Sequence, residues 1–154
     1  MIKINLVKEQ IKCIEILKNH VFGDKPIQIG YLSDPQVDFA HCNSKIVNYE
    51  SRNLNIGLPI FSIHGDHDAS YGLGGRSSLE LLHEAGLINY FGKVTDFECI
   101  KVRPILLGKG EIRVAIYGLS HIDDERLNRF FRERKVEFET PSEDQNSWFN
   151  KLHS

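Results

Sequence analysis

Cysteine is scarce in this chain of 154 residues: Cys13, Cys42 and Cys99 are the only three, and no CxxC pair occurs. A disulfide framework needs paired cysteines, and a structural zinc site needs closely spaced ones, so the sequence argues against both. A small, odd number of thiols favours a reducing, intracellular compartment.

Long apolar runs and an excess of one charge are also lacking. No segment approaches the ~20 apolar residues of a membrane-spanning helix, so no membrane partner is expected, and the first residues show no signal-peptide core. The 19 Lys and Arg nearly balance the 21 Asp and Glu, so nucleic-acid binding would need a local basic patch. The 41% hydrophobic and 26% charged content is typical of one globular domain.

Residues 4–22 have the apolar spacing of a helix face, and Gly23 and Pro26 end the pattern. The apolar positions are Ile4, Val7, Ile11, Cys13, Ile14, Ile16, Leu17 and Val21. Because this surface is wider than one stripe, we expect the helix to have partners on more than one side.

Strand-like and helical patterns follow along the chain. We predict strands over residues 27–32, 58–64, 100–107 and 112–119, and helices from Ser77 or Ser78 to about Gly86 and over 124–131. Gly108 to Glu111, between the last two strands, indicates a hairpin. Residues 33–56 are polar and weakly periodic, which predicts a long irregular excursion, uncommon in a compact domain unless it has a function.

The clearest candidate site is Gly65-Asp66-His67-Asp68, directly after the apolar strand of residues 58–64. The carboxyl end of a buried strand is where ligands bind in α/β folds. A carboxylate oxygen from Asp66 suits manganese or magnesium, and the imidazole of His67 suits proton transfer or stabilisation of charge in a transition state. The alternative is a polar turn in which Asp66 caps the following segment and His67 is merely exposed.

Other polar features have simpler interpretations. We expect His64 to be a strand residue rather than a ligand, and residues 72–78 lack the spacing and lysine of a phosphate loop. The arginines of residues 126–134 are expected on a solvated helix face, with phosphate contact as the alternative. The remaining histidines, to which no role is assigned, are His20, His41, His83, His121 and His153.

The segment of residues 59–68 resembles the third phosphoesterase motif of the eukaryotic meiotic recombination eleven nucleases, a family that repairs DNA double-strand breaks. Further segments match that family in order over roughly residues 6–150. They are residues 32–34, 47–49, 53–56, 86–93, 104–107, 117–119, 124–129 and 143–150.

The resemblance implies an α/β fold: a partial four-layer metallophosphoesterase domain over residues 1–154, with a mixed sheet flanked by helices and a loop insertion at 33–56. It makes Asp66 a metal ligand and His67 the catalytic residue. The family has asparagine at the position of Asp66, and its other metal-binding motifs are absent from this sequence. One ligand position cannot hold the two Mn²⁺ ions of the family enzyme, so we expect this chain alone to be inactive.

The function that the resemblance implies is a part of a manganese-dependent nuclease of the nucleus. The family enzyme is a 3′–5′ exonuclease and single-strand endonuclease in double-strand break repair and meiosis. Its expected partners are DNA, a second copy, the SMC-like ABC ATPase of the repair complex, and nibrin through residues 33–56. A small-molecule phosphatase fits the segments outside the motif less well.

The alternative function is an inactive module for dimerisation or partner binding. In the family, the helices that match residues 6–22 and 77–87 pack across a two-fold axis. The residues expected at this interface are Val7, Ile11, Ile14, Leu17, Leu79 and Leu82.

Overall fold

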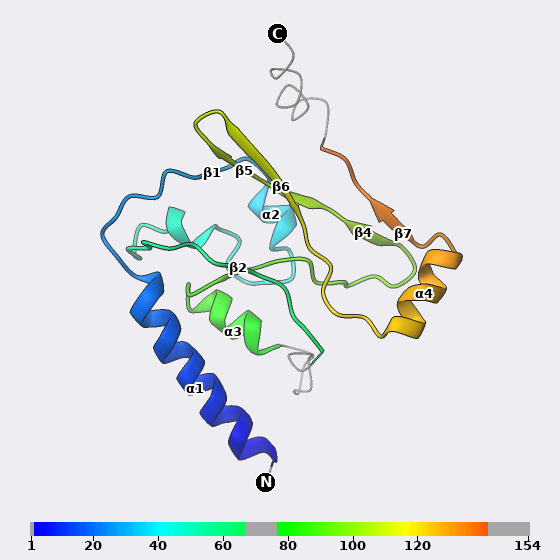
Figure 1. The fold of residues 1–154 in the computed structure, drawn as a ribbon, viewed down its shortest axis with the longest axis horizontal. Helices are drawn as coiled ribbons and strands as arrows, with labels where there is room; N and C mark the ends of the chain where they lie inside the picture. Colours follow the sequence, from blue (N-terminus) through cyan, green and yellow to red (C-terminus); the bar gives the residue numbers. More distant parts are fainter. Residues whose placement is uncertain (1, 67–76, 142–154) are drawn as a thin grey trace.

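The computed structural model describes residues 2–66 and 77–141, with the backbone alone for residues 2–7. Each of these two ranges contains both helices and strands (Figure 1). The elements are α1 (Ile2–Val21), β1 (Gly30–Tyr31), α2 (Pro35–Asp38), the 3-10 turn η1 (Asn48–Glu50), β2 (Phe61–Ser62), α3 (Ser78–Glu84), β3 (Asn89–Tyr90), β4 (Ile100–Val102), β5 (Pro104–Lys109), β6 (Ile112–Tyr117), α4 (Asp124–Arg132) and β7 (Val136–Phe138). The α/β class predicted from the sequence is confirmed.

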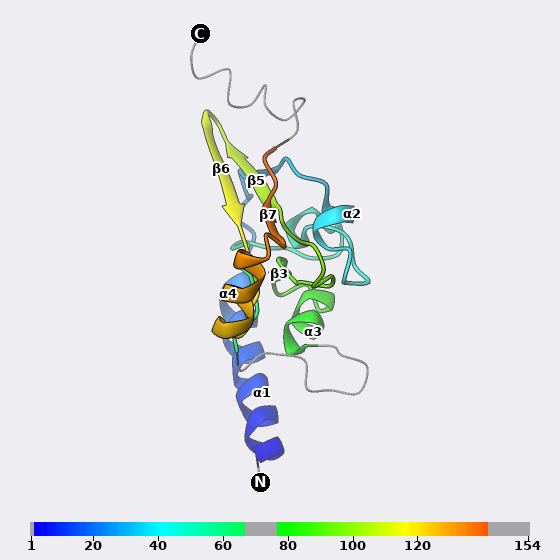
Figure 2. The ribbon, with the colours of Figure 1, turned by 90° about the vertical axis from the view of Figure 1, so that its right-hand side faces the viewer.

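The predicted first helix is confirmed as α1, which is attached to the rest of the chain mainly at its C-terminal end. Val21 is buried there, and the main chain just after the helix is bonded to a later segment, since the Gly23 N–H donates to the Asn55 carbonyl oxygen at 3.0 Å. The N-terminal half of α1 extends beyond the other elements in both ribbon views (Figures 1 and 2).

The strands form three small sheets rather than one continuous sheet. β1, β5 and β6 form an antiparallel sheet in the order β1-β5-β6, β2 pairs in parallel with β3, and β4 pairs in parallel with β7. The predicted hairpin is confirmed as β5–β6. Lys109 faces Ile112, and Gly110 takes a φ of 56° in the connection, a conformation that glycine adopts without steric cost.

All four predicted strands differ in extent from those of the structure, and the strand of 112–119 ends early, at Tyr117, as β6. The strand of residues 27–32 is reduced to β1, and the strand of 58–64 is reduced to β2, whose residues are half-buried rather than buried. The predicted strand of 100–107 is divided at Arg103 into β4 and β5, just before Pro104, which has no N–H to donate to a neighbouring strand. An alternating pattern shows which side chains share a face, but not how many residues find a strand to pair with.

The excursion of residues 33–56 contains two short helical elements, and the rest of it is irregular as predicted. The Asp34 side chain caps α2 by accepting the Gln36 N–H at 2.9 Å. The excursion is attached to the core by its own buried side chains, which include Phe39, Cys42, Val47 and Asn48.

Two hydrophobic clusters form the interior. The larger cluster joins the excursion to α3, β3 and β5, and its buried members are Phe39, Cys42, Val47, Leu82, Leu87, Ile88, Tyr90, Phe91 and Ile105. The smaller cluster packs α4 against the β4–β7 pair through Ile100, Val102, Ile122 and Phe130. The larger cluster therefore supports the strand that leads into the candidate motif.

Both remaining predicted helices are confirmed, with capping that the sequence indicates. Ser77 caps α3 by accepting the Glu80 N–H at 3.3 Å, and Gly86, at a φ of 73°, follows its last residues. In α4, Asp124 and Glu125 lie in the first turn and two arginines lie in the last turn, which is the charge order that the helix dipole favours.

Candidate functional site

Asp66 lies four residues beyond the parallel β2–β3 pair. The pairing places Ser62 beside Tyr90, and main-chain bonds continue on both sides, with the Asn89 N–H donating to Ile60 at 2.7 Å and the Phe91 N–H donating to Ser62 at 3.0 Å. Because parallel strands end at the same sheet edge, the main chain delivers Asp66 to the edge where β3 also ends. The carboxylate is exposed there.

His64 connects this edge to the interior. Its Nδ1 atom lies 2.6 Å from the Tyr90 hydroxyl, and its carbonyl oxygen accepts the His121 N–H at 3.0 Å. The expectation that His64 is a strand residue is wrong in detail, since β2 ends at Ser62. The ring is instead held against β3.

Tyr90 is buried completely, and desolvation raises the pKa of its hydroxyl to about 12, against an opposing effect of the Ser77 side chain. Its main-chain N–H donates to His83 Nδ1 at 3.1 Å. The other nitrogen of that ring, Nε2, lies 2.9 Å from the Ser44 carbonyl oxygen. Since Nδ1 accepts, Nε2 carries the proton and donates, and His83 joins α3 to the excursion and to β3.

The fit of these residues to a metal ion is incomplete. His67, Asp68 and the glycine-rich residues 72–76 lie outside the described residues. Within residues 2–66 and 77–141, no three His, Cys, Asp or Glu side chains are grouped closely enough to hold a metal ion. Asp66 therefore belongs to no such group within these ranges, and the described residues do not form a manganese site by themselves.

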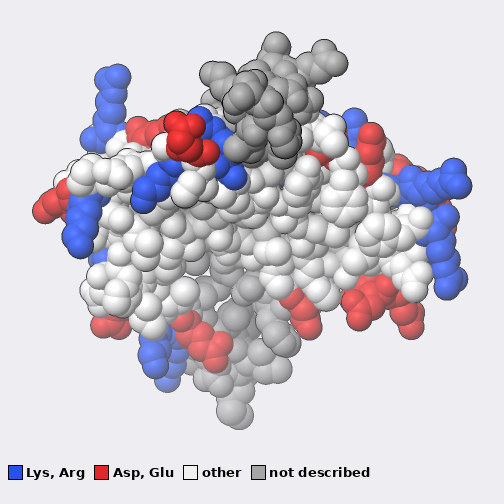
Figure 3. Space-filling model, turned by 45° about the horizontal axis from the view of Figure 1, so that its top comes forward, with Lys and Arg blue, Asp and Glu red and all other residues white. Residues whose placement is uncertain are grey.

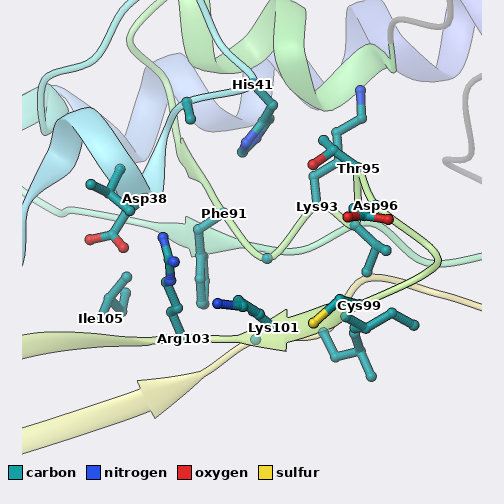
Figure 4. A pocket seen from close by; sticks show the side chains of 17 residues that line it. Asp38, His41, Phe91, Lys93, Thr95, Asp96, Cys99, Lys101, Arg103 and Ile105 are labelled. Carbon is teal, nitrogen blue, oxygen red and sulfur yellow. The ribbon is translucent and has the colours of Figure 1, made fainter. Parts of the chain in front are cut away.

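A cavity of about 320 Å³ opens between the excursion and the chain that leads from β3 to β4 (Figure 4). Acidic and basic side chains both line it. Lys101 and Arg103 both pair with Glu139, at 3.6 and 2.5 Å, and Lys93 pairs with buried Glu80. Since these cations already have carboxylate partners, the cavity has little excess positive charge to offer a phosphate.

His41 points into this cavity, and burial lowers the pKa of its imidazole to about 4, with Lys93 adding to the effect. Asp38, which also lines the cavity from the excursion, accepts the Tyr31 hydroxyl at 2.6 Å. Desolvation raises the pKa of this carboxyl. The cavity therefore presents a neutral imidazole rather than a cation at neutral pH.

A second hollow, of about 220 Å³, lies between α1 and α3. Its lining includes Cys13, Ile14, Leu79 and Leu82. Of the residues expected at a dimer interface, Ile11 and Ile14 are exposed, Leu17 and Leu79 are half-buried, and Leu82 belongs to the core, while the side chain of Val7 lies outside the description. The sequence did not single out Leu81, which lines the hollow and is 64% exposed.

The charges of the surface are mixed. In the view of Figure 3, lysines and arginines lie toward the margins among acidic residues and form no continuous basic area on that face. The guanidinium of Arg126 lies 4.1 Å from the centre of the Phe97 ring, and Arg129 pairs with Glu133 at 4.0 Å. These two arginines have partners within the chain, as expected of a solvated helix face.

Sequence reasoning missed the residues that organise this edge, namely Tyr90, His83, His41 and the amides of Asn48 and Asn89. One signal was available, because Asn89 and Tyr90 interrupt the apolar run Leu87, Ile88 and Phe91, and a buried polar side chain needs a specific partner. The two histidines carry no such signal, since His83 reaches Ser44 across 39 residues and the His41 ring packs on Tyr90 of a later strand.

No helix in the described ranges combines the length and the apolar character needed to cross a membrane. No protein-family model matches the chain. Curated proteins do. The chain is 46% identical over 138 residues to the double-strand break repair protein MRE11 of Homo sapiens, covering 90% of this chain and 20% of that protein.

The same relationship extends to fungi and plants. Identity is 45% over 145 residues to the double-strand break repair protein mus-23 of Neurospora crassa, covering 94% of this chain and 20% of the relative. It is 42% over 151 residues to MRE11 of Arabidopsis thaliana, covering 92% and 21%. The chain thus spans about a fifth of the length of the relatives it matches, and the family resemblance found in the sequence is confirmed.

Proposed function

Since this chain is homologous to one segment of the MRE11 double-strand break repair proteins, we propose that it is part of the nuclease core of such a protein. One observation carries the proposal. The chain brings Asp66 to the carboxyl edge of a parallel strand pair, which is the place where an α/β fold positions ligands. The name of the relatives supplies the reaction context, double-strand break repair.

In this proposal Asp66 supplies one ligand to Mn²⁺, and His67 acts on the phosphodiester of a DNA substrate. Bound manganese would act as a Lewis acid on a phosphoryl oxygen. The remaining ligands would have to come from outside the described residues, because those residues contain no further metal group. Exonuclease and single-strand endonuclease activity, action in meiosis and a nuclear location belong to the same proposal.

The chain alone is then expected to bind Mn²⁺ weakly and to leave DNA intact. Incubation of the purified chain with Mn²⁺ and end-labelled linear DNA tests this. Cleavage by the chain that disappears in both Asp66→Ala and His67→Ala would show that 154 residues suffice, and would contradict the proposal that other segments complete the site.

A second candidate function is favoured by the hollow between α1 and α3. Ile14 of α1 is 37% exposed and Leu81 of α3 is 64% exposed, and both line this hollow. Burial of such side chains contributes about 1.5–3 kcal/mol each. We propose a second copy of the chain as the occupant of this surface, with α1 and α3 of each copy in contact.

The excursion of residues 33–56 is the proposed contact for nibrin. Two features support this. Its interior side is held firmly by Asn48 and by the bond from His83, and its outer side exposes the apolar residues Val37 and Ile46. A contact with the SMC-like ABC ATPase is proposed from the family relationship alone, and no described surface distinguishes where it would lie.

A further inference from the structure

Tyr90 makes hydrogen bonds with residues on both sides of the motif segment. Its hydroxyl lies 2.6 Å from His64 Nδ1, immediately before Gly65 and Asp66. Its main-chain N–H donates at 3.1 Å to His83 Nδ1, in the helix that follows. β3, which carries Tyr90, lies next to α3 (Figure 2).

The hydroxyl is the part of Tyr90 that packing does not require. The ring is fully buried in the larger cluster and makes a T-shaped contact with the His41 ring at a centroid distance of 4.8 Å, and phenylalanine would fill the same space. A buried hydroxyl is costly unless it is bonded. Its bond with His64 therefore has a consequence beyond packing, because it fixes a ring only two residues from Asp66.

The main chain at His64 is held as well. The carbonyl oxygen of His64 accepts the His121 N–H at 3.0 Å, and the Ser120 N–H donates to Gly92 at 2.9 Å. The strand end, β3 and the chain after β6 thus meet at one point. With both its ring and its carbonyl held, His64 has little freedom to rotate, and neither has the peptide unit that leads to Gly65.

We propose that the Tyr90 hydroxyl is a positioning group for the candidate metal ligand, acting through His64 to fix the direction in which the chain presents Asp66. This rests on the proposed function only in treating Asp66 as a ligand. Tyr90 itself lies in the interior and would not touch metal or substrate. Ligand positions that vary by more than about 0.5 Å lose productive geometry, so a fixed strand end favours metal binding.

Tyr90→Phe removes the hydroxyl and keeps the ring. Tyr117→Phe is the matched control, since the Tyr117 hydroxyl donates to the Glu139 carbonyl oxygen at 3.1 Å, far from the motif along the chain. The first readout is amide hydrogen exchange. We expect the His121 amide to exchange about threefold to tenfold faster in Tyr90→Phe, as for the loss of one hydrogen bond, while the Ile100 amide, bonded to Lys135 at 2.7 Å, is unchanged.

The second readout is the ¹⁵N resonance of His64 Nδ1, which reports its hydrogen bond directly. It shifts in Tyr90→Phe and stays in place in Tyr117→Phe. If Tyr90→Phe fails to fold, His64→Leu and His64→Asn replace it. The asparagine amide can occupy the place of Nδ1 and is expected to keep the His121 amide protected, whereas leucine is expected to lose that protection.

The third readout uses Mn²⁺ alone as a probe, through paramagnetic broadening of the Asp66 amide resonance. The Asp66 amide resonance is expected to broaden equally in wild type and Tyr117→Phe. In Tyr90→Phe it is expected to broaden severalfold less at the same Mn²⁺ concentration. If the exchange rate of the His121 amide and the resonance of His64 Nδ1 are both unchanged in Tyr90→Phe, the positioning role of Tyr90 is overturned. Absence of broadening in wild type, with the exchange difference present, overturns Asp66 as a ligand and leaves the link between Tyr90 and His64 standing.

Discussion

Asn48 and Asn89 bind each other through two hydrogen bonds although 41 residues separate them in the chain. The Asn48 N–H donates to Asn89 Oδ1 at 2.8 Å, and Asn89 Nδ2 donates to Asn48 Oδ1 at 2.9 Å. Asn48 also donates through Nδ2 to the Gly86 carbonyl oxygen at 3.0 Å, and both side chains are buried. This pair joins the excursion to the strand beside the candidate site.

Asn89→Ala is therefore expected to destabilise the fold. It leaves the main-chain N–H and the side-chain oxygen of Asn48 without these buried bonds, and one such loss costs about 1–3 kcal/mol. Urea unfolding followed by circular dichroism measures the change. Asn53→Ala, at an exposed position of the same excursion, is the control and should unfold like wild type; equal midpoints for all three proteins would contradict the role of the pair.

Two glycines allow backbone strain to be separated from crowding. Gly86 and Gly110 both have positive φ, 73° and 56°. A Cβ at Gly86 would clash with Leu54 Cδ1, whereas a Cβ at Gly110 meets nothing within 4 Å. We expect Gly110→Ala to cost about 1 kcal/mol from backbone conformation alone, and Gly86→Ala to cost more, because Leu54 must also move. Thermal unfolding of both variants measures these two costs. A greater loss of stability in Gly110→Ala than in Gly86→Ala would rule out crowding by Leu54.

The sequence was sufficient to predict α1, α3, α4 and the β5–β6 hairpin, because each depends on local features such as the Ser77 cap and the glycine in the β5–β6 connection. The long-range contacts were not predictable in this way. Neither spacing nor composition shows that Asn48 meets Asn89 or that Tyr90 meets His64, since those pairs form only when β3 is placed beside β2. For the same reason the motif was visible in the sequence, but the residues that position it were not.

His41 is expected to make stability depend on pH. Its pKa is lowered from 6.5 to about 4 in the folded chain by burial and by Lys93, against the opposite effect of Glu80. Below pH 6.5 the unfolded chain therefore takes up a proton that the folded chain does not. Stability from this source is complete above pH 6.5 and is lost as the pH falls toward 4.

The measurement is the thermal midpoint at several pH values between 7.5 and 4.5. In His41→Gln the midpoint should fall less over this range than in wild type, because the titrating imidazole is gone. His20→Gln changes an exposed histidine of α1 and should follow the wild-type curve. A His41→Gln curve parallel to wild type would show that the imidazole is not desolvated.

The apolar surface of α1 and α3 is expected to hold two copies together. Wild-type chain at tens of micromolar should scatter light as a dimer. Ile14→Glu or Leu81→Glu, at residues that line the hollow between α1 and α3, should scatter as a monomer, since a charge in an apolar interface is strongly unfavourable. Ile112→Glu is the control, because Ile112 is 65% exposed on the hairpin, away from this surface. A wild-type monomer at this concentration contradicts the proposed interface.

Asp66 and His67 are expected to affect different steps once the remaining segments are supplied. The test protein is human MRE11 with the 138 matched residues exchanged for this chain. Asp66→Asn replaces a charged oxygen ligand with a neutral one, so Mn²⁺ should bind more weakly. Removal of the negative charge should also reduce repulsion of the DNA phosphate and raise turnover.

His67→Asn should lower turnover and leave Mn²⁺ affinity unchanged, because the loss of a group that acts only in the transition state alters only the chemical step. Manganese titration beside DNA cleavage rates distinguishes the two, with Asp123→Asn, an exposed carboxylate before α4, as the control. If His67→Asn abolishes metal binding, or Asp66→Asn changes neither quantity, the roles of ligand and catalyst are wrongly assigned.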